Sequence, residues 1–481
     1  MSDGLLIGLD LGTTAVKGVL IGLDGVVRDR FAERFPTMRE GARVEQDPAD
    51  WLRLVEAALA RFAPAAGEVR AIGLCSQVNT HVFSDRAGRP LCPAIVWQDT
   101  RPADAAAAID AKVAEADRLA WWGAPLPIDA SHALARMAWV MAEEPARWSE
   151  TARVYAPKDW VIRQLTGADG ADPVASVGLV DLALAYVDPL IAEVPGAAGR
   201  LPPLADPLSP AGEVASGPFS GVPLMRGTMD AWAGLFGVGA AEHGDGVWLS
   251  GTSEVLGLIS PVRQGAPGVI AFPTWRDITL HAGPTQAGGA SFEWVAKLLG
   301  QPMEALAALA ADARPGPIFL PHLQGERAPI WDPAARGAFA GLDAASGPGE
   351  LARAVMEGVA FSARWVFEAL EASAGGTVPQ RIRLGGGGAR SDLWCQIRAD
   401  ALGRPLERAA APDAGAVGAA ILAGVGVGAL PDLATASRAL APTERVFVPD
   451  PARAAEASAR YRIFRQFYEA LRPVNAGLTV L

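Results

Sequence analysis

A hydrophobic run that meets a Gly-Thr turn and then resumes as a second hydrophobic run occurs twice in this chain. The first copy is LLIGLDLGTTAVKGVLIGLDG, from Leu5 to Gly25, and the second is GVWLSGTSEVLGLI, from Gly246 to Ile259. Each copy predicts a β-hairpin whose turn presents backbone amides and hydroxyl groups. Such turns suit the binding of phosphate. Two copies in one chain predict a nucleotide held between two related domains.

The length of 481 residues, half of them apolar, exceeds what one domain usually needs. We place the boundary near EHGDG, which gives an N-terminal domain of residues 1–243 and a C-terminal domain of residues 244–481. The net charge of −11 argues against a nucleic-acid or anionic-membrane partner. Apolar stretches are interrupted well before a membrane span is complete, and the N-terminus lacks the basic region of a signal peptide. These features predict a cytoplasmic protein.

Hydrophobic periodicity predicts an α/β fold in both halves. Strands alternate with helices whose apolar positions follow a 3.6-residue period, and the order of elements after Gly246 resembles that at the N-terminus. The strands expected in the first half are Leu5–Leu9, Val16–Leu23, Val26–Phe35 and Val69–Gln77, with a hairpin over His81–Trp97; helices are expected from Asp47-Pro48 onward and over Ala103–Arg118, Leu134–Glu144, Pro157–Leu165 and Ala231–Ala241. In the second half we expect helices over Ser291–Leu299, Leu351–Ala372 and Ala452–Leu471 and a strand over Arg381–Leu384.

The residues in and around the first turn offer groups that can bind a phosphate. Gly12 lets the backbone approach a phosphate closely, and Thr13 and Thr14 supply hydroxyl and amide donors. Asp10 is suited to hold a hydrated Mg²⁺, and Lys17 adds positive charge. An ordinary hairpin would explain the same residues, but the repeat in Gly251, Thr252 and Ser253 favours phosphate binding.

A run of four glycines, Gly385 to Gly388, lies between a predicted strand and a predicted helix. A glycine run there lets a nucleobase or ribose lie against bare backbone, although a loop without a ligand is the alternative. Neither of the two Gly-Thr turns matches the sequence pattern of a P-loop or of a Rossmann dinucleotide-binding motif. The candidate nucleotide-binding and phosphate-binding residues are Asp10, Gly12, Thr13, Thr14, Lys17, Gly251, Thr252, Ser253, Gly289, Gly386, Gly387, Gly388 and Ser391, with Asp10 also the candidate metal ligand.

Ten segments in order along the chain resemble one family. They are LDLGTTAVK, SQVNTHVF, PAIVWQDTR, APKDWVIRQLTG, GTMDAWAGLFGVG, SGTSEV, AGGASFEW, LQGERAPIWDPAARGAFAGL, LGGGGARSDLWCQIRADALGRPL and GAVGAAILAGVG. In these the chain resembles the FGGY carbohydrate kinases of the actin/Hsp70/hexokinase superfold, and most resembles their xylulose-kinase branch. The resemblance implies two ribonuclease-H-like domains of the actin-like ATPase type, with ATP in the cleft between them and a sugar or polyol held mainly by the first.

The same resemblance places Asp230, in GTMDA, at the position of the catalytic base. A carboxylate there would accept the proton of a sugar hydroxyl as that hydroxyl attacks the γ-phosphate of ATP. Asp230 begins the predicted helix AWAGLFGVGAA, whose N-terminal dipole we expect to keep it ionised. An N-cap without a catalytic role is the alternative.

Candidate sugar-binding residues follow the strand that ends near Gln77. An extended backbone would place Gln77, Asn79 and His81 on one face. By resemblance, xylulose kinases have Gln-Met-His-Gly here and glycerol kinases Gln-Arg-Glu-Thr, so Val78 and Asn79 depart from both and leave the sugar open. A surface histidine without a ligand is the alternative for His81. Trp97 and Asp99 match the family segment in which an indole packs on the substrate and an acidic residue supports the site.

The sequence therefore predicts an ATP-dependent and Mg²⁺-dependent kinase for a small sugar or polyol, with a ketopentose such as xylulose as the preferred substrate. A kinase for a linear polyol of the glycerol or erythritol type is the alternative within this class. Two other classes stay open, namely an actin/Hsp70-like ATPase that works through protein partners and a catalytically silent sugar sensor. A homodimer also stays open.

Overall fold

The structure, a computed structural model, describes residues 4–410 and 413–478. Contacts divide the chain into two units. Unit 1 holds residues 1–239, 273–275 and 413–441, and unit 2 holds residues 240–272, 276–412 and 442–481. The sequence interpretation had assigned all of 244–481 to one domain, whereas contacts assign residues 413–441 to unit 1. That segment is decisive for the candidate site.

Unit 1 is built on a seven-stranded sheet in the order β10-β11-β6-β1-β2-β3, with β12 added beside β6. Strand β1 pairs antiparallel with β2 and parallel with β6. Strand β6 is in turn parallel to β12. The strands are β1 (Leu5–Leu11), β2 (Ala15–Gly22), β3 (Val27–Arg34), β6 (Val69–Ser76), β10 (Pro210–Glu213), β11 (Pro223–Met225) and β12 (Thr228–Met229).

Helices and two small sheets surround this sheet. The helices are α1 (Pro48–Phe62), α2 (Ala103–Asp110), α3 (Glu115–Trp122), α4 (Ala133–Glu143), α5 (Pro145–Glu150), α6 (Pro157–Thr166), α7 (Asp188–Ile191), α8 (Asp230–Gly237), α13 (Ala414–Gly426) and α14 (Leu433–Leu440). The small sheets consist of β4 (Met38–Glu40), β5 (Arg43–Gln46) and β8 (Ala94–Ile95), and of β7 (Val82–Ser84) with β9 (Arg153–Tyr155).

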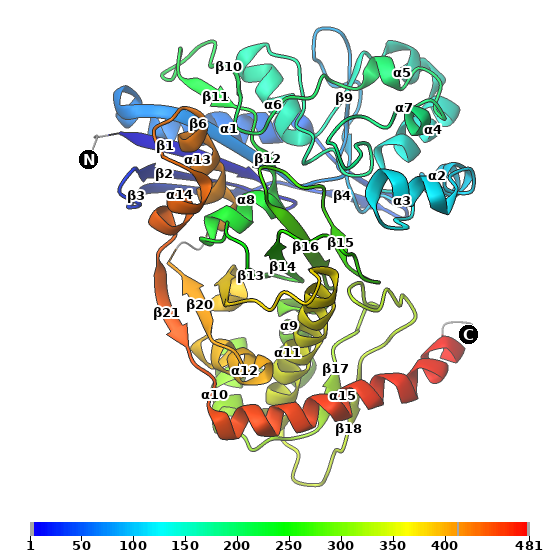
Figure 1. Ribbon diagram of the computed structural model, residues 1–481, viewed down its shortest axis with the longest axis vertical. Helices are drawn as coiled ribbons and strands as arrows, with labels where there is room; N and C mark the ends of the chain where they lie inside the picture. The colour runs from blue at the N-terminus through cyan, green and yellow to red at the C-terminus, as the bar shows by residue number, and fades with distance from the viewer. Residues whose placement is uncertain (1–3, 411–412, 479–481) are drawn as a thin grey trace. The chain divides into compact units, whose positions relative to one another are not determined.

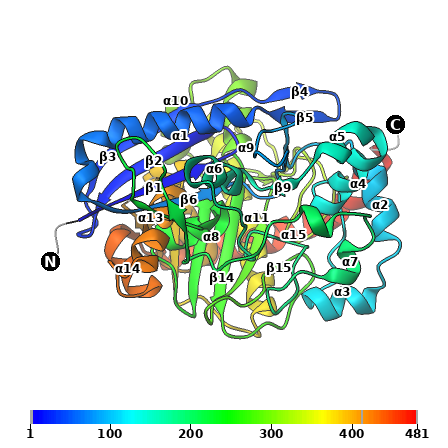
Figure 2. The same cartoon turned by 90° about the horizontal axis from the view of Figure 1, so that it is seen from above.

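Strand alternation gives β1 two different faces. Ile7 and Leu9 belong to the core that contains Trp51 and Leu54 of α1. The intervening residues face α13, since a Cβ atom at Gly8 would lie 1.8 Å from the carbonyl oxygen of Ala416. Figure 2 shows α1 on one side of β1 to β3 and α13 on the other. Asp10 is two residues after Gly8 and therefore lies on the same face of β1, the face that contacts α13.

Helix α13 packs against the sheet and α8 at backbone distance. A Cβ atom at Gly73 would lie 2.0 Å from the carbonyl oxygen of Ala419, and one at Gly418 would lie 1.7 Å from that of Ala233 in α8. Glycine is required at such contacts because any side chain would overlap a backbone that cannot move. In Figure 1 this helix lies beside β1 and β6, although 340 residues separate Cys75 of β6 from Gly415 of α13 in the sequence.

Unit 2 repeats the strand arrangement of unit 1. Its seven-stranded sheet has the order β15-β16-β14-β13-β19-β20-β21, with β13 antiparallel to β14 and parallel to β19. This repeat confirms the predicted two-domain α/β fold. The strands are β13 (Asp245–Ser250), β14 (Glu254–Ser260), β15 (Ile270–Ala271), β16 (Thr279–Pro284), β17 (Ile318–Leu320), β18 (Ala338–Ala340), β19 (Arg381–Gly385), β20 (Leu406–Ala409) and β21 (Thr443–Phe447); the helices are α9 (Gly289–Leu299), α10 (Met303–Asp312), α11 (Pro348–Ser373), α12 (Asp392–Leu402) and α15 (Pro451–Leu478).

Two predicted elements of the first half were wrong in detail. The hairpin over 81–97 is reduced to isolated bridges such as His81 to Ile95, because β7 pairs with β9 and β8 pairs with β5. The helix over 103–118 is broken into α2 and α3. The Arg118 guanidinium donates to the carbonyl oxygens of Asp110 and Val113, so that it satisfies carbonyls left open where α2 ends.

A separate observation concerns membranes. Among the residues that the structure describes, no helix combines the length and the apolar character needed to cross a bilayer.

The α13 contacts give a stability prediction. Alanine has the higher helix propensity, so Gly418→Ala would stabilise an open helix position by up to about 1 kcal/mol. At 1.7 Å from the carbonyl oxygen of Ala233, we expect a loss of about 2 kcal/mol or more instead. Urea unfolding measures the change. Gly67→Ala is the control, since no atom lies within 4 Å of its Cβ position, and it should stay within about 0.5 kcal/mol of wild type. Equal stability of both variants would contradict the packing argument.

Candidate active site

The carboxyl ends of parallel strands meet at one edge of the unit 1 sheet. Asp10 is paired with Cys75 in neighbouring β6, and Cys75 is also paired with Thr228 in β12. Asp230 follows β12 directly. The chain therefore brings Asp10 and Asp230, 220 residues apart in sequence, to the same edge around Cys75. Ligand sites of α/β sheets occur at this edge.

Asp10 is half-buried against α13. Its Oδ1 accepts a weak hydrogen bond from the Cys75 thiol at 3.5 Å, and a Cβ atom at Gly415 would lie 2.5 Å from its Oδ2. Burial raises the pKa of Asp10 to about 6, against the lowering effect of Lys17 and of the thiol. Lys17 itself lies 3.7 Å from Asp413. The Asp10 oxygens thus keep most of their acceptor capacity for a ligand.

Asp230 is the first residue of α8, and Met229 is the N-cap. Its Oδ1 accepts a hydrogen bond of 2.7 Å from the Ala231 amide. Burial, followed by the negative charge of Asp10, raises the pKa of Asp230 to about 7, and the backbone hydrogen bonds lower it only in part. The helix dipole was expected to keep Asp230 ionised, but desolvation raises the pKa so far that the carboxyl is mostly ionised only above about pH 7. A carboxylate that titrates near neutrality suits a general base.

A buried ion network supports the segment before Asp230. The Lys158 ammonium lies 2.6 Å from an oxygen of Asp159 and 2.7 Å from one of Asp172, and all three side chains are buried. The other Asp172 oxygen accepts a hydrogen bond of 2.9 Å from the Thr228 hydroxyl in β12. Because Thr228 is two residues before Asp230, the network fixes where α8 begins.

Gln77 is buried and fully engaged. Its amide nitrogen donates to Gln46 at 2.8 Å, and its amide oxygen accepts from the Thr80 hydroxyl at 3.2 Å. Gln46 in turn donates to the carbonyl oxygen of Thr13 at 2.7 Å. Gln77 therefore connects the predicted sugar segment to the first phosphate turn.

The predicted alternation of Gln77, Asn79 and His81 on one face was wrong. β6 ends at Ser76, and Asn79 has a φ of 54°, in the left-handed region that asparagine tolerates better than most residues. The chain turns there, and the Asn79 side chain donates to Ser131 at 3.1 Å. Val78 and Asn79 are half-buried beside this turn.

Arg136 organises His81. The buried Arg136 guanidinium donates to His81 Nδ1 at 2.8 Å, to the carbonyl oxygen of Val96 at 2.7 Å and to that of Asn79. Burial and the charge of Arg136 hold the pKa of His81 well below its usual range. Since Nδ1 accepts, the neutral ring carries its proton on Nε2, which makes His81 a fixed hydrogen-bond donor.

Trp97 and Asp99 have different surroundings. The Trp97 indole donates to the Thr13 hydroxyl at 3.2 Å and is 36% exposed, so it covers the first turn. Asp99 is buried and accepts from the Val44 amide at 2.8 Å and from Arg101 at 2.7 Å. Asp99 thus fixes the backbone around Trp97.

The candidate residues of unit 2 gather around Ser250. The amides of Gly289 and Ala290, at the start of α9, donate to the carbonyl oxygens of Gly251 and Thr252 at 2.9 and 3.0 Å. Cβ atoms at Gly386 and Gly388 would lie 2.4 and 2.1 Å from Ser250 atoms. Ser253 completes the turn, the accessible Gly387 lies in the glycine loop, and Ser391 caps α12 by accepting from the Trp394 amide.

A buried ion pair that the sequence interpretation missed ties these segments together. Arg398 donates to Glu254 at 2.7 Å, to the Ser250 hydroxyl at 2.6 Å and to the carbonyl oxygen of Gly388 at 3.2 Å. The residue directly before the glycine of the second turn, Ser250, thus belongs to a closed internal network, and no carboxylate stands two residues before Gly251 as Asp10 stands before Gly12. The available signal was an arginine on the otherwise apolar face of α12 that carries Cys395 and Ala399.

Comparisons with known proteins cover nearly the whole chain. The description "FGGY family of carbohydrate kinases, N-terminal domain" matches residues 5–237, and the corresponding C-terminal domain matches residues 247–427. The chain belongs to the FGGY family of carbohydrate kinases. It is therefore an ATP-dependent carbohydrate kinase, which confirms the family and enzyme class predicted from the sequence.

Three relatives place this kinase within the family. It is 31% identical to the xylulose kinase of Escherichia coli (strain K12), over 98% of this chain and 100% of that protein. It is 32% identical to the glycerol kinase of Gloeobacter violaceus, over 92% of both chains. The crystal structure of xylulose kinase from Rhodospirillum rubrum has a TM-score of 0.88 and 28% identity, and covers 98% of this chain and 100% of that chain.

The raised pKa of Asp230 predicts how stability depends on pH. The folded kinase binds the Asp230 proton more tightly than the unfolded chain, so this contribution to stability is complete below about pH 4 and is lost as the pH rises through about 7. Asp230→Asn removes the titration. We expect its thermal midpoint to match wild type near pH 4.5 and to exceed it by about 2 °C or more at pH 8.

The exposed Asp312 provides the control, since Asp312→Asn should leave the difference from wild type constant with pH. A wild type that gains stability relative to Asp230→Asn as the pH rises would contradict the assignment of the buried carboxyl.

Proposed function

We propose that this kinase transfers the γ-phosphate of ATP to a ketopentose, with xylulose as the first candidate and Asp230 as the general base. The observation that carries the proposal is the position of Asp230 beside Asp10 at the carboxyl edge of the sheet, with a pKa raised to about 7. Xylulose is favoured because the Escherichia coli xylulose kinase matches this chain over its full length.

In this proposal Asp230 accepts the proton of the attacking sugar hydroxyl as the oxygen bonds to the γ-phosphorus and the bond to the leaving ADP oxygen breaks. The network of Lys158, Asp172 and Thr228 holds the start of α8, so that the carboxylate meets the hydroxyl in one orientation. Unit 2 contributes the glycine turns around Ser250 to nucleotide binding. The predicted position of the nucleotide relative to the two units stays a prediction.

Asp10 fits a hydrated Mg²⁺. The described residues contain no group of three or more His, Cys, Asp or Glu side chains arranged for a metal. A magnesium ion at Asp10 would be held by one carboxylate, water and phosphate oxygens. Asp10 has only the weak thiol hydrogen bond to compete with such an ion. The ion would neutralise phosphate charge next to Asp230.

The sugar is proposed to lie against Trp97, Asn79 and His81. His81 offers its Nε2 hydrogen to a hydroxyl, and the exposed part of the Trp97 indole offers an apolar surface to the carbon chain. Gln77 and Asp99 do not contact the sugar in this proposal. Gln77 supports the Thr13 turn, and Asp99 supports the backbone around Trp97. Val78 borders the same turn.

A linear polyol is the second candidate. The glycerol kinase of Gloeobacter violaceus is as similar to this chain as the xylulose kinase, and the backbone at Asn79 turns where the predicted extended sugar segment would continue. Both candidates require the same base.

The test is ATP turnover by wild type and Asp230→Asn over a panel of pentuloses, hexuloses, tetritols and glycerol. We expect wild type to form ADP only with an added acceptor and fastest with xylulose. Asp230→Asn should lose kcat by about 10²-fold to 10⁴-fold while its Kd for ATP stays near wild type. Asp312→Asn is the matched control and should keep full kcat.

Each other outcome selects a different function. Fastest turnover with glycerol or a tetritol would replace xylulose by the polyol. Equal turnover without an acceptor would indicate an ATPase of another kind, and binding without turnover would indicate a sensor. Near-wild-type kcat in Asp230→Asn would overturn the base assignment.

A further inference from the structure

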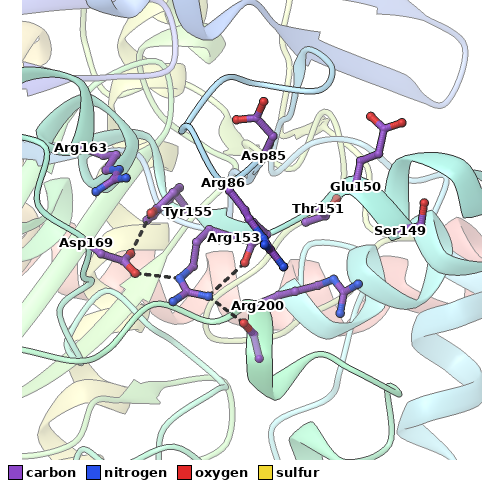
Figure 3. Close-up of a pocket in the computed structure, with 12 residues that line it drawn as sticks. Asp85, Arg86, Ser149, Glu150, Thr151, Arg153, Tyr155, Arg163, Asp169 and Arg200 are labelled. Carbon is purple, nitrogen blue, oxygen red and sulfur yellow. Dashed lines mark hydrogen bonds and ion pairs between the residues drawn. The ribbon is translucent and has the colours of Figure 1, made fainter.

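A cleft in unit 1 shares no residue with the candidate sugar-binding and nucleotide-binding sets. It has a volume of about 480 Å³, within the range of small-molecule sites. Its walls come from the loop after β7, the end of α5, β9, α6 and the turn at Arg200. Figure 3 shows Arg86, Arg153 and Arg200 in the middle of this cleft, with Arg163 near Tyr155 and Asp169.

The cleft carries uncompensated positive charge in a chain of net charge −11. Of its four arginines, Arg153 alone forms an ion pair with a carboxylate, that of Asp169 at 2.8 Å. The carboxylate of Asp85 is paired with Arg89, outside the cleft, at 2.7 Å. Among the described residues, Arg86, Arg163 and Arg200 have no carboxylate partner, and Glu150 is the one lining acid left to oppose them. When the charges of Asp169 and Glu150 are subtracted from those of the four arginines, the cleft keeps a net charge of +2.

Three of the guanidinium groups are held in place by neutral acceptors. Arg200 donates to the carbonyl oxygens of Gly196 and Trp148 at 2.8 and 3.0 Å and stacks on the Trp148 ring at 4.0 Å. Arg153 donates to the Gly199 carbonyl oxygen at 2.7 Å, and Arg163 donates to that of Gly167. These bonds orient the guanidinium groups without neutralising them, so little side-chain entropy remains to be lost on binding.

We propose that this cleft binds the phosphate dianion of a small phosphorylated sugar. A phosphate monoester carries close to two negative charges at neutral pH, which balance the net positive charge of the cleft. The planar forks of several guanidinium groups match phosphate oxygens. The volume admits a sugar together with the phosphate, and a sugar phosphate is the chemical class that a carbohydrate kinase forms. Inorganic phosphate shares the recognised group.

The cleft wall is continuous with the support of Asp230. Asp169 lines the cleft, and Asp172, three residues later, bonds Lys158 and Thr228. Arg163 and Lys158 lie on the same helix α6. A ligand here therefore contacts the element that positions the catalytic edge without occupying it.

Isothermal titration calorimetry tests the proposal on the full-length kinase saturated with a non-hydrolysable ATP analogue, which fills the phosphate position of the active site. The probes are ribose 5-phosphate, inorganic phosphate and ribose. The test variant combines Arg86→Ser with Arg163→Gln and retains the Arg153 and Arg200 contacts. The control combines Arg30→Ser with Arg34→Gln, two exposed arginines of β3, and removes the same charge elsewhere.

We expect wild type and control to bind ribose 5-phosphate, more weakly as salt rises, and the test variant to bind it at least about tenfold more weakly. Ribose should not bind. If inorganic phosphate binds wild type more weakly than ribose 5-phosphate does, the ligand is a sugar phosphate. If the two bind equally well, the cleft recognises phosphate alone, and the proposal that it also recognises the sugar is overturned. No binding to wild type, or equal weakening in both variants, overturns the proposal.

Discussion

The contact on which the candidate site depends is the backbone-distance packing of α13 against β1, β6 and α8. Carbonyl oxygens of Ala416 and Ala419 occupy the space where side chains of Gly8 and Gly73 would stand, and Gly418 lies against Ala233 in the same way. One helix thereby fixes the spacing between the strand that carries Asp10 and the helix that starts at Asp230. A side chain at any of these glycines would overlap the facing backbone.

The same packing explains the electrostatics of the site. Helix α13 covers one side of Asp10, where Gly415 lies against the carboxylate. Burial raises the pKa of Asp10 to about 6, and burial together with the charge of Asp10 raises that of Asp230 to about 7. Two carboxylates at one half-buried edge have a lowered tendency to ionise together, which is how folds create a base that titrates near neutral pH.

Local signals in the sequence predicted the elements well, and non-local contacts account for what was missed. Both Gly-Thr hairpins formed where the alternation and turn residues placed them, with β1 and β2 ending within two residues of the prediction. Contacts place residues 413–441 in unit 1, unlike the sequence interpretation, because their partners, such as Gly8, lie some 400 positions earlier in the sequence. The glycines at 415, 418 and 424 were the available signal, since glycine inside a helix indicates close packing. The roles of Gln77 and Asn79 depend on Gln46 and on a left-handed turn, neither of which strand periodicity predicts.

We propose that the glycine-packed helix α13 holds Asp230 at the carboxyl edge of the sheet, where the pKa of Asp230 is near 7 and the carboxylate acts as the base. The pH dependence of kcat/KM for the sugar is the test, because that ratio reports ionisations of the free enzyme. We expect kcat/KM to rise about tenfold per pH unit in the acid range and to level off above about pH 7. A profile that is flat from about pH 5 to about pH 8, as expected of a carboxylate with an ordinary pKa, would contradict it.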